Sequence, residues 1–261
     1  MRLPITSLRY TIAALAGMLI AGPRLNTITR SVQAGKTVYI KRRRWYAATL
    51  IAAATHSRAR FRTLPVHEWH VWEPGVYRQY YGEAVAIIAD GALVVPARPG
   101  RTLAEIIAGG SGTPLALAGV AAALHALAAL HHQTITLPDG QARPFSHGDA
   151  TVNNVTYEPA SNAAFWFDFE TAHDQHCPHA WRCADDLRAA LFSATAVLGS
   201  SQIDALASIV QIAYPEPCVL AQLRTIISQL IAHPDPWHLA QAPLSYEHHQ
   251  ALSNALLRVL A

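Results

Sequence analysis

The fold is decided by the stretch Ser146-His147-Gly148-Asp149-Ala150-Thr151-Val152-Asn153-Asn154, followed by the apolar run Phe165-Trp166-Phe167 and then by Asp168-Phe169-Glu170. A carboxylate on a loop thus precedes an amide by five residues, and a second carboxylate follows an apolar segment with the character of a buried strand. This order suits phosphoryl transfer, in which one carboxylate handles an acceptor hydroxyl while the amide and the other carboxylate hold Mg²⁺. The spacing therefore predicts a nucleotide site.

Upstream of this stretch the sequence predicts antiparallel strands. Residues 26–42 favour two strands with a turn at Ala34-Gly35-Lys36, and the second strand runs through Val38-Tyr39-Ile40-Lys41 into the basic run Arg42-Arg43-Arg44. Two further strand-like runs, 83–89 and 92–96, are joined by Asp90-Gly91, a strong signal for a hairpin. A small sheet that carries Lys41 is therefore expected in the N-terminal part.

From Leu103 onward the composition becomes helical. The segment 115–132 has leucine and valine residues at helical spacing. Further helices are expected at 185–198, 203–213, 218–233 and 248–260. A sheet followed by helices predicts the α+β class, with the boundary between the two parts at about residue 97.

Composition excludes several classes of protein. The 261 residues are 51% hydrophobic and only 14% Asp, Glu, Lys or Arg, against ~25% charged residues in typical soluble domains. Such a chain is globular rather than disordered, and it is long enough for two small lobes. The net charge of +3 is too small to argue for a nucleic-acid partner, and three cysteines do not make a disulfide framework, so a reducing compartment is expected.

The N-terminal residues hold an apolar stretch, Tyr10 to Gly22, preceded by Arg2 and Arg9. It is too short to span a bilayer, which takes roughly 20 residues. A packed helix is the expected state. A signal peptide and a helix lying on a membrane surface remain open alternatives.

The sequence His147-Gly148-Asp149 with Asn154 resembles the catalytic loop of the protein-kinase-like superfamily, in the branch of aminoglycoside phosphotransferases and lipopolysaccharide core (Kdo/heptose) kinases. The resemblance spans roughly residues 29–195. Within it Lys41 looks like the strand lysine, residues 96–103 look like the hinge, and residues 184–187 look like the acidic start of the helix that braces the loop. The resemblance implies a two-lobed α+β fold with ATP and Mg²⁺ between a small antiparallel sheet lobe and a mainly helical lobe.

The resemblance also implies residue roles and boundaries. Asp149 would be the catalytic base, and Lys41 would contact the α- and β-phosphates. Asn154 and Asp168 would be the Mg²⁺ ligands, with His147 and Asp186 as structural supports of the loop. The expected parts are an N-terminal apolar helix (1–25), a nucleotide-binding sheet lobe (26–96) and a C-terminal lobe (97–261) with the catalytic and metal-binding loops.

The partner of Lys41 departs from the family pattern, because no acidic residue lies between it and Glu68. We expect Glu73 to be the partner, because Glu73-x-x-Val76-Tyr77-Arg78 resembles the family's glutamate on a helix that runs into the next strand. This short helix is expected to begin at Glu73-Pro74 and to run through Tyr80, since Pro suits a first helical turn. Glu68 is the competitor. Residues 45–72 would then form a basic and aromatic insert.

The glycine-rich loop is the second departure, because residues 31–35 offer only Gly35. A catalytically silent nucleotide-binding protein therefore stays open. A Walker A loop at Gly35-Lys36-Thr37 is excluded, since its first glycine would fall on Arg30.

Two clusters have alternative interpretations. One could bind zinc, but its spacing matches no common site, so surface or substrate-facing residues are expected; its members are His173, His176, Cys177, His179 and Cys183. The other is the basic and aromatic segment 41–72, which could face anionic lipid or a phosphorylated glycan, or could simply be a packed and solvated face. Its arginines are Arg42, Arg43, Arg44, Arg58, Arg60 and Arg62.

The expected activity is an ATP- and Mg²⁺-dependent kinase that transfers the γ-phosphoryl group to a hydroxyl. The expected acceptor is a lipopolysaccharide core sugar, another glycan or a small molecule. Protein kinase activity and a silent scaffold are the alternatives. We expect a cytoplasmic protein, with peripheral contact to the inner membrane surface left open and no nucleic-acid partner.

Overall fold

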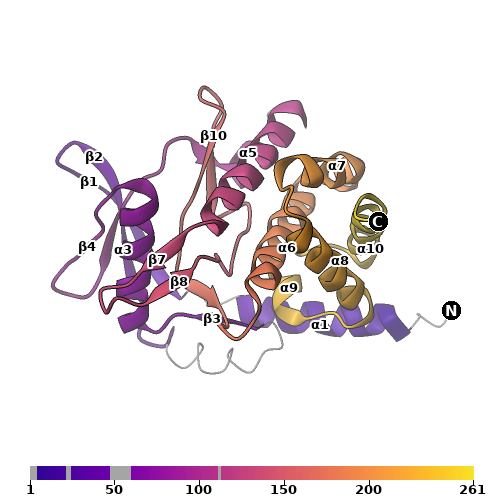
Figure 1. The fold of residues 1–261 in the computed structure, drawn as a ribbon, viewed down its shortest axis with the longest axis horizontal. Coiled ribbons are helices and arrows are strands. Elements are labelled where there is room, and N and C mark those ends of the chain that lie inside the picture. The colour runs from indigo at the N-terminus through magenta and orange to yellow at the C-terminus, as the bar shows by residue number, and fades with distance from the viewer. Residues whose placement is uncertain (1–4, 22–24, 48–59, 111–112) are drawn as a thin grey trace.

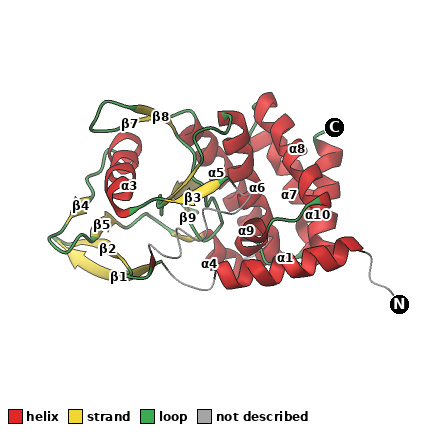
Figure 2. Cartoon of the chain, turned by 90° about the horizontal axis from the view of Figure 1, so that it is seen from below, coloured by secondary structure: helices red, strands yellow, loops and turns green. Residues whose placement is uncertain are grey.

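The computed structural model describes residues 5–21, 25–47, 60–110 and 113–261. Antiparallel strands dominate the N-terminal part, and a mostly helical region follows (Figure 1). Figure 2 shows the first sheet and α3 at one end of the molecule, with α1 and α6 to α10 gathered at the other. The α+β class predicted from the sequence is confirmed.

The N-terminal sheet has four antiparallel strands in the order β1-β2-β5-β4. They span Asn26–Gln33 (β1), Lys36–Arg43 (β2), Leu93–Pro96 (β5) and Ala86–Ile87 (β4). The β1–β2 hairpin closes at Ala34 and Gly35, both with positive φ (47° and 75°), as a tight two-residue turn requires. Both predicted hairpins are present, although β4 is shorter than the expected run 83–89.

Helix α3 (Val66–Tyr81) begins earlier than expected. The prediction that it starts at Glu73-Pro74 is wrong, because Pro74 lies inside the helix. The ring removes one backbone donor there, and burial of Trp69 and Trp72 in the core supports the extra turns. The expected insert 45–72 therefore contains β3 (Phe61–Thr63) and the first half of α3; its residues 48–59, with Arg58, lie outside the described part.

Short strands in the middle of the chain carry the polar stretches. A three-stranded sheet has the order β10-β9-β6, where β6 is Arg101–Thr102, β9 is Val155–Glu158 and β10 is Ala163–Trp166. A separate hairpin joins β7 (Thr134–Thr136) to β8 (Ala142–Pro144), and β11 (Thr171–His173) pairs with β3. Strand β9 begins just after Asn154 and β10 ends just before Asp168, so the pairing of these strands brings the two polar clusters together.

The remaining helices build the second part of the molecule. They are α4 (Leu103–Ala108), α5 (Thr113–His131), α6 (His179–Leu198), α7 (Ile203–Ala213), α8 (Pro217–Ala232), α9 (Pro236–Gln241) and α10 (Tyr246–Val259), with a 3₁₀ turn at Ser200–Gln202. The predicted start of α6 at Asp185 is wrong. Asp185 and Asp186 are buried in the helix interior and hold internal partners, so they do not mark its N-terminus. The short helix α9 was not predicted.

Helix α5 is long and apolar enough to cross a bilayer, with a mean hydropathy of 1.6 over residues 114–131. Half of that window is buried inside the protein, where Leu124 and Leu127 are fully covered. One of its carbonyl groups makes a contact distant in sequence, since the Ala123 carbonyl accepts from the indole of Trp166 at 2.9 Å. It thereby ties β10 to the helical region.

Helix α1 (Ile5–Ala21) lies across α9 and α10. Tyr10 and Ala13 are buried against Leu239, and the Tyr10 hydroxyl donates to the Leu244 carbonyl at 2.9 Å. A Cβ atom on Gly17 would lie 2.3 Å from the carbonyl oxygen of Pro236, so only glycine permits this close approach of the two helices.

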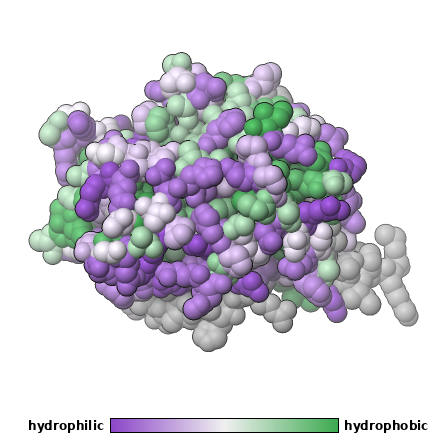
Figure 3. Space-filling view, viewed as in Figure 1, coloured by the Kyte–Doolittle hydropathy of each residue, from purple (hydrophilic) through white to green (hydrophobic). Residues whose placement is uncertain are grey.

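The outer side of α1 and the residue that follows the basic run 41–44 leave apolar side chains exposed. Leu8, Ile12 and Leu15 are each more than half exposed, and Trp45 is 92% exposed. On the face of the molecule seen in Figure 3, apolar residues are instead interspersed with hydrophilic ones. The low charge content of the chain therefore does not produce one continuous apolar surface on that face.

Candidate active site

Lys41 lies at the centre of a buried charge cluster. It is only 4% exposed on β2, and its Nζ donates to both carboxylate oxygens of Glu73, each at 2.9 Å. The same nitrogen donates to Oδ1 of Asp168 at 2.5 Å. The indole of Trp69, one helical turn before Glu73 on α3, also donates to Glu73. The Glu73 carboxylate is thus held from two sides.

Glu68 has a different partner. It lies on another face of α3 and accepts two hydrogen bonds from Arg62, at 2.8 and 2.5 Å. Of the two glutamates considered for Lys41, the structure therefore brings Glu73 to the lysine and keeps Glu68 away from it.

The charges in the cluster stabilise one another. Burial lowers the pKa of Lys41, but the surrounding carboxylates of Asp168, Glu73 and Glu170 outweigh it and raise that pKa above its usual value. Burial acts to raise the pKa of Asp168, but the Lys41 charge dominates and the pKa is lowered. Both groups therefore stay ionised at neutral pH.

Asp168 adopts an unusual backbone conformation. Its φ of 68° is in the left-handed region, which few residues other than glycine adopt. Hydrogen bonds of the preceding residue fix the chain just before this bend, because the Phe167 N–H donates to the Asn154 carbonyl at 3.0 Å and the Phe167 carbonyl contacts His147 Nε2 at 3.0 Å. The bend leaves the Asp168 side chain 22% exposed, so part of it remains accessible.

Asp149 is oriented by two amides. The Asn154 side chain donates from Nδ2 to the Asp149 carbonyl at 2.8 Å and to its Oδ2 at 2.9 Å, and Gln241 at the end of α9 donates to Oδ1 at 2.8 Å. Burial raises the pKa of Asp149, although the hydrogen bond from Gln241 opposes it. Gln241 was missed in the sequence, where an isolated glutamine far from the motif gives no signal.

Asp186 braces the loop that carries Asp149. Its carboxylate accepts from the backbone N–H groups of His147 at 2.6 Å and Gly148 at 2.8 Å, and it contacts His131 Nε2 at 3.0 Å. Gly148 has a φ of 79°, and a Cβ there would lie 3.0 Å from the backbone nitrogen of Ala172. The loop conformation therefore needs both the aspartate and the glycine.

Asp185 anchors a second network behind the loop. Arg188 donates to it at 2.8 Å, His173 and His238 contact it at 3.2 and 3.1 Å, and Arg188 also donates to Gln241 at 2.6 Å. Burial opposes ionisation, but Arg188 and the histidines hold the pKa of Asp185 well below its usual value. The network connects α6 to Gln241 and through it to Asp149.

The His/Cys cluster was expected to hold surface or substrate-facing residues, and a surface position is wrong for three of its members. His173, Cys177 and Cys183 are buried, His179 is partly buried, and His176 is exposed. Cys183 contacts His179 at 3.5 Å, whereas His173 is committed to Asp185. Within the described part of the chain, no group of three or more His, Cys, Asp or Glu side chains is arranged to hold a metal ion.

A Mg²⁺ site of the kind expected here needs fewer than three protein ligands, since Mg²⁺ in nucleotide sites is held by one or two side chains together with substrate phosphates. Asn154 uses its amide nitrogen on Asp149, and among the described residues no hydrogen bond uses its Oδ1. Asp168 engages Lys41 through Oδ1 and retains Oδ2. Amide and carboxylate oxygens are the ligands that Mg²⁺ prefers, so these two residues fit the ion.

No family model, curated protein or solved structure matches the chain. The chemistry of the site therefore has to be derived from its own residues.

Proposed function

We propose that the chain is an ATP- and Mg²⁺-dependent phosphotransferase with a protein-kinase-like fold, which moves the γ-phosphoryl group to a hydroxyl acceptor. The observation that carries the proposal is the Lys41 ammonium held by Glu73 and Asp168. Four segments far apart in the chain contribute to this cluster and to the adjacent Asp149 loop, and the same residues follow one motif order in the sequence.

Lys41 would supply positive charge to the phosphates. Glu73 keeps the Lys41 ammonium charged and fixed on β2. When ATP binds, the ammonium would exchange its contact with Asp168 for contacts with phosphate oxygens. Asp168 and Asn154 would hold Mg²⁺, which neutralises charge on the phosphate oxygens when it is bound. The chain's own contribution is the fixed position of these groups, which saves entropy and reorganisation during the reaction.

Asp149 would accept the proton of the acceptor hydroxyl. Its raised pKa makes it a stronger base than an exposed aspartate, and the amides of Asn154 and Gln241 fix the direction of its lone pairs. Asp186 acts through His147 and Gly148 as a positioning residue, because it holds the backbone on which Asp149 is carried.

The proposed acceptor is a lipopolysaccharide core sugar, another glycan or a small molecule. The proposed location is the cytoplasm, with peripheral contact to the inner membrane surface. The exposed apolar side chains of Leu8, Ile12 and Leu15 on α1 support that contact, since an amphipathic helix binds a membrane through such a face. No nucleic-acid partner is proposed.

The substitution Asp149→Asn tests the reaction. We expect turnover to fall at least about 1,000-fold while Mg²⁺-dependent ATP binding, measured by calorimetry, remains close to wild type. The acceptors to be tested in the turnover assay are a panel of glycans, aminoglycosides and proteins. Asp204→Asn is the matched control, because the Asp204 side chain is 88% exposed on α7 and its ion pair among the described residues is with Arg258. Full activity in Asp149→Asn would remove Asp149 from its role.

A catalytically silent nucleotide-binding protein is the second candidate. The 2.5 Å contact between Lys41 and Asp168 favours this candidate, since it engages the lysine and the aspartate that would otherwise bind phosphate and Mg²⁺. The β1–β2 turn also offers the single glycine Gly35 where kinases have a glycine-rich loop. ATP binding without transfer to any acceptor on the panel would select this candidate. Transfer to proteins alone would instead identify a serine/threonine-type protein kinase.

A further inference from the structure

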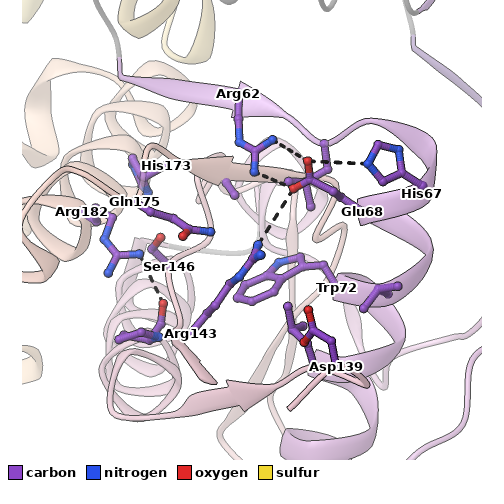
Figure 4. Close-up of a pocket in the computed structure, with 15 residues that line it drawn as sticks. Arg62, His67, Glu68, Trp72, Asp139, Arg143, Ser146, His173, Gln175 and Arg182 are labelled. Atoms are coloured by element: carbon purple, nitrogen blue, oxygen red, sulfur yellow. Dashed lines mark hydrogen bonds and ion pairs between the residues drawn. The ribbon is translucent and has the colours of Figure 1, made fainter. Parts of the chain in front are cut away.

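A cavity of about 200 Å³ lies beside α3, next to Glu68 rather than Glu73. Its walls come from β3, α3, the β7–β8 hairpin, β11 and α6 (Figure 4). Neither Lys41, Asp149 nor Asp168 lines it. The cavity is therefore separate from the charge cluster on β2.

Cationic side chains enter the cavity from three elements. Arg62 of β3 is paired with Glu68, and Arg143 of β8 reaches the same carboxylate only at 4.0 Å. Figure 4 shows these two arginines pointing at Glu68 from opposite sides. Arg182 of α6 has no carboxylate partner in the described part of the chain, and its one hydrogen bond there goes to the Pro144 carbonyl at 3.3 Å. With Asp139 included, three guanidinium groups face two carboxylates.

Two residues of the wall also carry a covered donor without an acceptor in the described part of the chain. Nε of Arg182 and Nε1 of Trp72 are both without a partner among the described residues, and the two side chains are 8% and 7% exposed. Both groups can only donate. A buried donor left unpaired costs free energy, but these two atoms are covered by protein and do not reach the cavity. The positive charge of the wall comes from its three guanidinium groups, which exceed its two carboxylates by one.

The size of the cavity limits what can bind beside its guanidinium groups. Pockets for drug-sized ligands measure about 300–1,000 Å³, and 200 Å³ is too small for a nucleotide. Guanidinium groups match phosphate oxygens in pairs, and arginines from three directions suit a tetrahedral anion better than a planar carboxylate. We propose that this cavity binds inorganic phosphate or a small phosphomonoester at a site distinct from the one for ATP.

The experiment is calorimetric titration of the full chain with inorganic phosphate, at ionic strength held constant with chloride. Acetate is the planar comparison. We expect saturable phosphate binding, much weaker acetate binding, and phosphate affinity reduced about tenfold or more in Arg143→Gln and Arg182→Gln. Methyl phosphate in the same titration decides between inorganic phosphate and a phosphomonoester, since the ligand that binds more tightly identifies the class that the cavity takes.

Two controls separate this site from its surroundings. Arg258→Gln, at an exposed pair with Asp204, should bind phosphate as the wild type does. Lys41→Met should also retain phosphate binding, because Lys41 does not line the cavity. Loss of binding in Lys41→Met with retention in Arg143→Gln would overturn the proposal and assign the phosphate to the nucleotide site.

A loss of phosphate binding can be distinguished from a loss of folding. Arg182 is buried, and its substitution can destabilise the chain, whereas the Arg143 side chain is 28% exposed on a hairpin. Thermal unfolding with and without phosphate gives a second measurement, in which a ligand of the folded state raises Tm. A Tm shift equal in wild type and Arg143→Gln would overturn the proposal, as would the absence of phosphate binding to the wild type.

Discussion

Helix α3 carries two glutamates in two different surroundings. Glu73 is fully buried, and Lys41 and Trp69 occupy its carboxylate. The Glu68 side chain is 26% exposed and is shared by Arg62 and Arg143 beside donors that have no acceptor. Five residues along a helix rotate the side-chain direction by about 140°, so Glu73 and Glu68 point to different surroundings. We call the buried group around Glu73 the closed cluster and the partly exposed group around Glu68 the open cluster. The closed cluster is suited to hold a lysine in place, and the open one to receive an anion.

Substitution of Glu73 should produce the largest effect. Glu73→Gln leaves the buried Lys41 with one carboxylate fewer, and breaking a buried ion pair costs about 3–5 kcal/mol. The free energy of unfolding from denaturant titration should fall by that amount. Under the proposed function, turnover should fall about 100-fold or more, since the lysine loses its fixed position. A variant with the stability and turnover of the wild type would show that Glu73 does not hold Lys41.

The pH dependence of stability extends the comparison to His249, a buried group that has no ion pair with a carboxylate in the described part of the chain. Burial lowers the pKa of His249 on α10 to about 4, below its ordinary value of about 6.5. Between these two values the unfolded chain binds a proton that the folded chain does not, so stability falls as pH drops from 6.5 to 4. The contribution is on the order of 3 kcal/mol. His249→Leu should flatten the curve of unfolding free energy against pH in this window; an unchanged curve would assign the effect to other groups.

The two tryptophans of α3 form a matched pair for the third prediction. Trp69 donates to Glu73, whereas Nε1 of Trp72 has no partner among the described residues. Substitution by phenylalanine removes the indole N–H and a similar side-chain volume at both positions. Because a hydrogen bond to a charged group contributes about 1.5–3 kcal/mol, Trp69→Phe should cost about that much more than Trp72→Phe in chemical unfolding. Equal costs would contradict the distinction between the closed and open clusters.

The smallest effect on stability is expected at Glu68. Its pair with Arg62 is partly exposed, and such pairs contribute about 0–1 kcal/mol. Glu68→Gln also removes a negative charge from the cavity wall, so phosphate should bind more tightly than in the wild type while the unfolding free energy changes little. Weaker phosphate binding in this variant would indicate that Glu68 orients the arginines rather than competing with the anion.

Local patterns were sufficient to predict part of this molecule. The turns at Ala34-Gly35 and Asp90-Gly91 depend on neighbouring residues alone, so both hairpins could be predicted. The motif from His147 to Asp168 likewise pointed to the residues that the structure joins by hydrogen bonds. Glu73 could be preferred over Glu68 because its surroundings looked like a helix leading into the next strand.

Tertiary burial explains what could not be predicted. Pro74 has the sequence signature of a first helical turn, yet two buried tryptophans extend α3 ahead of it. Asp185 and Asp186 have the signature of a helix start, yet they are internal anchors. The contact of Gln241 with Asp149 joins residues 92 positions apart, and the cavity likewise combines arginines from three distant elements, so no local pattern marks either.

The packing of α1 on α9 has a consequence for the order in which the molecule is assembled. Tyr10 and its acceptor Leu244 are 234 residues apart, which at 5–20 residues per second separates their synthesis on the ribosome by roughly 10 to 50 s. Tyr10 and Ala13 cannot be covered before the residues of α9 exist, and the same helix ends on Gln241, which holds Asp149. One late event during biosynthesis thus both shields the first described helix and completes the loop that carries Asp149.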